Sequence, residues 1–220
     1  MKRISLLIYA LTAALTSCIN INAHLDSAKG EVVERTITFT EDITSVAVSS
    51  GIDVTVDPTL PRGEVHILTH TDVQDLVAVT VENNSLDIKL SPMSLCAEVL
   101  EVRIPAYDFN SVATSGGSDF TWECCAAQTL NIAASSGSDI EIKGHCKVLN
   151  AAASSGADLD LEELITENVT VAASSGSDVH IHATMQLTAN ATSGADITYS
   201  GDPQHTHVNT SSGADINKAR

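Results

Sequence analysis

Six aspartates recur at nearly constant spacing in the C-terminal half of the chain, and they are the first residues that could do chemistry. Successive members lie 20, 19, 20, 18 and 19 residues apart: Asp119, Asp139, Asp158, Asp178, Asp196 and Asp215. Each follows a small Ser-Gly segment, as in SSGSD at 135–139. A ladder of carboxylates could collect divalent cations, which prefer oxygen ligands, or the basic groups of a partner.

The residues that follow each aspartate predict the direction of its side chain. In calcium-binding nonapeptide solenoids the buried residue follows the aspartate by two, which places both side chains on one face. Here the apolar residues follow by one and three, as Ile140 and Ile142 do after Asp139. We therefore expect the carboxylates to point outward.

Stacked outward, two carboxylates about 5 Å apart repel by about 1 kcal/mol in water. Two interactions could offset that repulsion. Each aspartate could accept hydrogen bonds from its own corner, as in an Asx turn, or the ladder could bind cations or basic groups. The sequence leaves both alternatives open.

The elements that position this ladder are short strands. Counted from each aspartate, apolar or small residues recur at positions −7, −5, +1 and +3 and alternate with polar residues, which is typical of strands buried on one face. Two strands would flank each Ser-Gly corner and leave roughly eight residues for a third side. Because one copy is too small to bury its own apolar face, the copies must stack. We predict an all-β fold, a parallel β-helix of about 19 residues per coil, with the usual right-handed crossover.

The N-terminal part is less regular. An earlier copy of the corner, SSGIDVTV, begins at Ser49, but the period lapses before residue 111. Strands are predicted over 64–70, 76–81, 86–90 and 98–104, with a hairpin turn at Asn83-Asn84-Ser85. This part is either a set of irregular coils or an antiparallel cap. We favour a single domain over 34–218, with 34–110 irregular and 111–218 regular.

The amino-acid composition restricts the classes of partner that the protein could bind. The formal charge is −17, with 11 Lys and Arg against 28 Asp and Glu, and such a field disfavours nucleic acid and other polyanions. No nucleophile elbow, phosphate loop or metal-binding helix is present. The carboxylate pairs Asp158/Asp160 and Glu162/Glu163 could in principle hydrolyse sugars, so a polysaccharide-active enzyme is the alternative to a non-enzymatic protein.

The first residues predict export. Lys2 and Arg3 precede a mostly apolar stretch too short to span a bilayer, which is typical of a signal peptide over 1–17. Leu15-Thr16-Ser17-Cys18 resembles a bacterial lipobox, so Cys18 would carry the lipid and 18–33 would form a lipidated spacer. The lipid would be the only membrane anchor and would place the protein in the cell envelope.

Export also permits disulfides. Cys124 or Cys125 precedes Cys146 by roughly one coil, and Cys96 could take the remaining thiol, so we predict at least one bridge. Two histidine pairs, His180/His182 and His205/His207, are spaced to share an outward face and could bind metal. They lack a defined third ligand, so no cofactor is expected.

Several ordered motifs carry a family resemblance: SGIDVTV near residue 50, NNSLDIKL from Asn83, VRIPAYDFNSVATSGGSDF from Val102, the serial SG[SA]D units and ITYSGDP from Ile197. Over roughly 34–218 the chain resembles the auto-transporter adhesin "head GIN" family of bacterial envelope proteins. The resemblance implies a β-helical fold and an envelope setting, and it brings no catalytic motif. We expect a binding, adhesion or structural role, with an extended glycan or another envelope protein as partner. A homodimer through open coil ends is also allowed.

Overall fold

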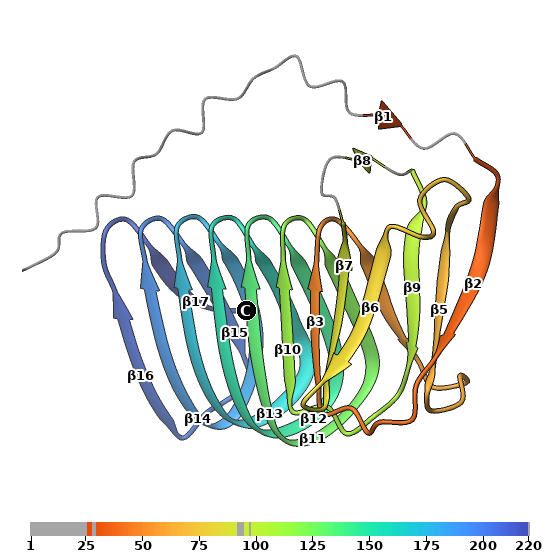
Figure 1. Ribbon diagram of the computed structural model, residues 1–220. Coiled ribbons are helices and arrows are strands. Elements are labelled where there is room, and N and C mark those ends of the chain that lie inside the picture. The colour runs from red at the N-terminus through yellow and green to blue at the C-terminus, as the bar shows by residue number, and fades with distance from the viewer. Residues whose placement is uncertain (1–25, 28–29, 92–94, 97, 220) are drawn as a thin grey trace, which may run out of the picture.

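The computed structural model describes residues 26–27, 30–91, 95–96 and 98–219. All regular secondary structure in these ranges is β. The strands form a parallel β-solenoid of about five turns with repeats about 20 residues apart, which confirms the predicted fold class. In Figure 1 the coils lie side by side along one axis, from β2 and β5 at one end to β16 at the other. None of the described residues belongs to a helix that could cross a membrane.

The regular coils differ from the prediction in one respect. The strands of this part are β11 (Asp119–Ser135), β12 (Asp139–Ser154), β13 (Asp158–Ser174), β14 (Asp178–Thr192), β15 (Asp196–Ser200), β16 (His205–Thr210) and β17 (Asp215–Lys218). In β11 to β14 each coil is one long strand that runs from corner to corner, instead of two strands and a separate third side. These strands bend at β-bulges such as the register shift between Trp122 and Cys125. Bulges bend a strand without ending its pairing. In the last coil, residues 201–204 separate β15 from β16.

The Ser-Gly corners work because two successive residues adopt left-handed backbone. At one corner Ser136 has φ 59° and Gly137 has φ 67°. The next residue, Ser138, is fully buried, and its hydroxyl accepts a hydrogen bond from the Ser135 amide at 3.1 Å. The corners also bond to one another, since the Gly137 amide donates to the Ser155 carbonyl at 3.2 Å.

The N-terminal part combines both predicted alternatives. β3 (Ser45–Ser49) and β4 (Asp53–Asp57) stack in register on β10 (Ser111–Ser115) and on β11. The later strands β7 (Ser85–Leu90) and β9 (Leu100–Pro105) then pair parallel with β3 and β4 on their far side. After its first coil, β3 and β4, the chain forms a second one, β7 and β9, on the side away from the regular series. We call this second coil the outer coil.

Antiparallel strands cover that outer coil. β5 (Glu64–His70) pairs with β9 and with β2 (Val32–Thr38), and β6 (Val77–Glu82) pairs with β7. The predicted hairpin turn is confirmed, because Asn83 and Asn84 have φ values of 51° and 63° between β6 and β7. A small separate pair joins β1 (Asp26–Ser27) and β8 (Leu95–Cys96).

The core is a continuous aliphatic column. The residues at positions −7, −5, +1 and +3 are buried in the regular coils, as Ile132, Ala134, Ile140 and Ile142 illustrate. The last described coil is the exception, since every residue of β16 is exposed and Val208 is 46% accessible. Each stacked coil thus covers its neighbour, as expected for repeats that cannot bury their own apolar face.

Candidate functional site

The predicted acidic ladder is present and faces outward. The six regular aspartates and Asp53 are paired in register from coil to coil, and all seven are exposed. Partial burial between stacked neighbours, followed by the charge of the adjacent carboxylates, raises the pKa of Asp119 and Asp139. The carboxylates of Asp119 and Asp139 accept hydrogen bonds from the backbone of the aspartate on the next coil, Asp139 and Asp158, which partly offset the rise in pKa. The Asx-turn hypothesis stays a prediction.

The histidine pairs do not build a metal centre. His180 and His182 lie on β14, whereas His205 and His207 lie on β16. The His182 Nδ1 atom is 2.9 Å from the Ser200 hydroxyl. Within the described ranges no three His, Cys, Asp or Glu side chains come together as a metal-binding group, whether on the ladder or near the histidines.

The carboxylate pairs considered for catalysis lie on open surface. Asp158 and Asp160 line a shallow hollow of about 300 Å³ beside the ladder. Glu163 is 3.9 Å from the ammonium of Lys143, which also contacts Glu141 at 2.9 Å. Glu163 thus belongs to a surface ion-pair cluster around Lys143, and Asp158 belongs to the ladder.

The cysteines of the regular coils are free thiols in this structure, with Cys124 exposed and both Cys125 and Cys146 buried. Cys125 faces Gly144 on the adjacent coil, two residues before Cys146. Burial, followed by the proximity of Cys146, raises the pKa of Cys125 to about 12. The bridge expected from the sequence stays a prediction. The lipidation site Cys18 lies outside the described residues, and so does the side chain of Cys96.

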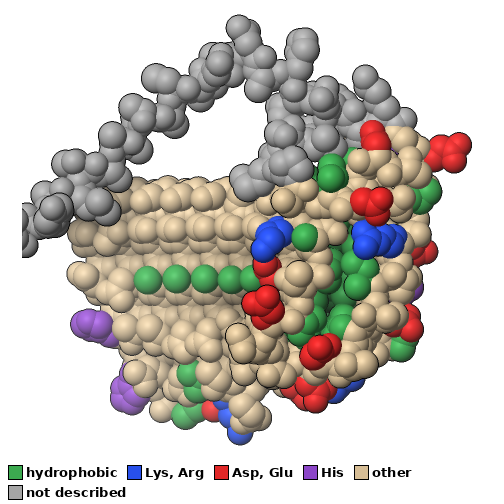
Figure 2. All heavy atoms as spheres, viewed as in Figure 1, with side chains coloured by type: hydrophobic (Ala, Val, Ile, Leu, Met, Phe, Trp, Pro, Cys, Tyr) green, Lys and Arg blue, Asp and Glu red, His purple; other side chains and the backbone are tan. Residues whose placement is uncertain are grey.

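A neutral face runs along the solenoid on the strand segments that precede the Ser-Gly corners. Five alanines occupy position −6 of successive coils and stack in register, and we call them and the serines at position −4 beside them the alanine face: Ala47, Ala113, Ala133, Ala152, Ala172, Ser49, Ser115, Ser135, Ser154 and Ser174. Figure 2 shows the alanines as one straight row across the coils. A shallow groove of about 620 Å³ follows them.

The surroundings of the alanine face are polar but uncharged over most of its length. On one side, the Asn150 side chain donates to that of Asn131 at 3.0 Å, and Thr170 continues the same row. At the N-terminal end the row meets Asp87, which is paired with Lys89 at 2.6 Å. The result is a flat neutral strip on an acidic protein, with groups repeated every ~4.8 Å.

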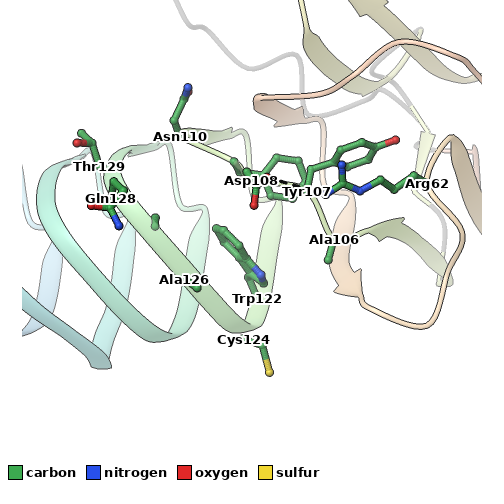
Figure 3. Close-up of a pocket in the computed structure, with 12 residues that line it drawn as sticks. Arg62, Ala106, Tyr107, Asp108, Asn110, Trp122, Cys124, Ala126, Gln128 and Thr129 are labelled. Carbon is green, nitrogen blue, oxygen red and sulfur yellow. Dashed lines mark ion pairs between the residues drawn. The ribbon is translucent and has the colours of Figure 1, made fainter.

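A second hollow lies where the regular coils meet the N-terminal part. This cavity of about 510 Å³ is lined by Trp122, by Arg62 and by the segments 106–110 and 126–129, with Cys124 also on its wall. Its aromatic side is continuous, because the rings of Tyr107 and Phe109 lie 5.8 Å apart and those of Phe109 and Trp122 lie 5.4 Å apart. Figure 3 shows Trp122 between Tyr107 and Ala126. The sequence reasoning missed this cavity, although its aromatics are concentrated in 107–122 of an aromatic-poor chain.

Comparisons with known proteins agree with this architecture. A structure described as a "putative adhesin" from Bacteroides fragilis is superimposable with a TM-score of 0.72 at 13% identity, covering 88% of this chain and 100% of its own. A "putative lipid binding protein" from Parabacteroides distasonis gives a TM-score of 0.55 at 14% identity, covering 89% of this chain and 99% of its own. At these identities the likeness shows the fold alone. No curated protein matches the chain.

The family of the chain is shown by its sequence. Residues 42–203 match the family model described as "Putative auto-transporter adhesin, head GIN domain". The match includes the outer coil, five of the regular Ser-Gly corners and every ladder aspartate except Asp215. The chain belongs to the auto-transporter adhesin head GIN family.

Proposed function

We propose that the protein is a non-enzymatic, adhesin-like binding protein of the bacterial envelope, and that its alanine face binds an extended neutral glycan. The observation that carries this proposal is the long uncharged strip on a chain of net charge −17. Ala133, Ala152 and Ala172 are exposed there and have no bulky neighbours in their row.

The chemistry of the face fits such a polymer. Alanine methyls offer small apolar contacts, and the flanking serines and asparagines offer donors and acceptors at constant spacing. The side chains are short, so little rotamer entropy is lost when a ligand is bound. A rigid sheet is also already organised for binding, which lowers the cost of association.

Lipid anchoring at Cys18 belongs to the same proposal. The signal-like segment and the Leu-Thr-Ser-Cys motif support it, and the family description supports an envelope setting. An anchored solenoid would present its long face to polymers at the cell surface.

A glycan array with the purified chain tests the face. The double variant Ala133→Glu/Ala172→Glu places two carboxylates in the groove, two coils apart. The matched control His145→Glu/Met185→Glu adds the same charge at exposed positions outside the face. Melting curves of both variants establish that they fold.

We expect the chain and the control variant to retain the same glycans and the face variant to lose them. Equal binding by all three proteins would contradict the proposal, and so would an array on which the chain retains no glycan.

A further inference from the structure

The cavity beside Trp122 is lined by polar side chains. Trp122 is 5% exposed and lies in the cavity wall. The side chains of Asn110, Gln128 and Thr129 line the same cavity and are exposed. These polar side chains can donate hydrogen bonds to a ligand and accept them from it.

The aromatic wall is fixed before any ligand arrives. The Gly63 amide donates to the Tyr107 hydroxyl at 2.8 Å, and the Arg62 guanidinium lies over the Tyr107 ring at 4.9 Å from its centre. Phe109 then packs edge-on against Trp122. The wall therefore needs no rearrangement to receive a ligand.

The cavity lining carries little net charge. Arg62 is its one basic group among the lining residues, and Asp108 lies 4.0 Å from it. The lining is thus close to neutral inside a strongly acidic protein. Its remaining polar groups are amides and a hydroxyl, which both donate and accept hydrogen bonds.

The volume of the cavity and its apolar residues also suit a small ligand. A volume of about 510 Å³ lies within the range of roughly 300–1,000 Å³ that is typical of small-molecule sites. Ala106, Ala126 and Ala127 form apolar patches beside the polar groups. A ring that has apolar C–H faces, and whose hydroxyl groups donate and accept hydrogen bonds, would complement such a lining.

We propose that this cavity is a binding subsite for one or two rings of a neutral carbohydrate, held by Trp122, Asn110, Gln128 and Thr129. The inference concerns a second site and stands whether or not the alanine face binds a glycan. If both sites bind, the cavity would take a chain end or a branch.

Trp122 makes the cavity directly observable, because it is the only tryptophan in the sequence. We would titrate the purified chain with glucose, galactose, mannose, N-acetylglucosamine and their disaccharides and follow the tryptophan emission. Alkylation of Cys124 by iodoacetamide, followed by peptide mass, gives a second readout, since this exposed thiol lines the cavity. Glucuronate serves as the anionic control.

We expect a saturable change in emission with at least one neutral sugar, and slower alkylation of Cys124 in its presence. Gln128→Ala should weaken binding roughly 3- to 10-fold, the range for one lost hydrogen bond. The control Gln186→Ala, at an exposed position of β14, should not. Trp122→Phe keeps an aromatic ring without the N–H and should reduce the protection of Cys124.

Three outcomes would overturn the inference: no neutral sugar changes the emission or protects Cys124, binding is the same in Gln128→Ala, or glucuronate binds in preference to the neutral sugars. None of them bears on the alanine face, because Trp122 reports only on the cavity.

Discussion

Asp119 and Asp139 are paired in register on adjacent coils, and each carboxyl has a raised pKa because its neighbours bury it and repel its charge. An acid whose pKa is raised by folding binds more protons in the folded state. Its contribution to stability is therefore greatest below the ordinary aspartate pKa and decreases as the pH rises through the raised value. At neutral pH the ladder is a cost to this fold.

The variant Asp139→Asn should consequently be more stable than the parent at neutral pH. Exposed charge pairs contribute at most about 1 kcal/mol, so we expect a rise of about 1–3 °C in Tm, which disappears near about pH 4. Thermal melts across that pH range measure it. Asp202→Asn is the control of opposite sign, because Lys218 lowers the pKa of Asp202; a loss of stability in Asp139→Asn at neutral pH would contradict the account.

Substitution of the buried corner serine Ser138 should have a larger effect on the free energy of unfolding. Ser138 accepts from the Ser135 amide and bonds with the Thr114 hydroxyl at 2.9 Å. Ser138→Ala leaves both groups unpaired in the core and should lower the free energy of unfolding by about 1–3 kcal/mol. Urea unfolding tests this value, with exposed Ser136→Ala as the control, and an unchanged midpoint for Ser138→Ala would show that the hydroxyl is dispensable.

Alanine substitutions at two glycines distinguish steric crowding from the cost of a left-handed backbone. A Cβ on Gly144 would lie 2.2 Å from the Cys125 carbonyl oxygen, whereas one on Gly156 would meet nothing within 4 Å. Gly156→Ala then carries only the left-handed backbone cost of about 1–2 kcal/mol, and Gly144→Ala should exceed it. Calorimetric melting of both variants gives the order, and equal losses would argue against close packing of these coils.

Thiol reactivity tests the cysteine geometry. In the reduced folded protein, Cys124 should be alkylated readily, while Cys125 and Cys146 should react slowly, because burial raises the pKa of both buried thiols. The predicted disulfide is examined separately, by alkylating protein exported by cells after unfolding it without reductant. Complete modification of Cys96, Cys124, Cys125 and Cys146 would refute the bridge.

Much of the fold could be predicted because local patterns determine it. Apolar residues one and three positions after each aspartate require an outward carboxylate, and Asn83-Asn84 suits the left-handed backbone of a hairpin. The position of β7 and β9 outside β3 and β4 could not be predicted, since a coil with this pattern can stack on either end of the column. The prediction of separate strands in each coil was also wrong, because β11 and β13 bend at bulges without a Gly or Pro to mark them.

The candidate sites were less predictable than the fold. The alternation already indicated rows of small and hydroxyl side chains, but only the register shows that Ala113, Ala133, Ala152 and Ala172 form an unbroken line. The cavity joins Arg62, Tyr107 and Trp122, which lie on separate elements. Only the structure shows that Asn110, Gln128 and Thr129 line the same cavity as these residues.

The most direct test of the account is an NMR titration of the chain labelled at its alanine methyls with a glycan that the array identifies. We expect shifts along the row from Ala113 to Ala172, with no response from Ala157 and Ala195, which are buried at the corners. Shifts at Ala106, Ala126 and Ala127 would report separately on the cavity. A row that shows no shifts when the glycan is at saturation would contradict the claim that the alanine face is the binding surface.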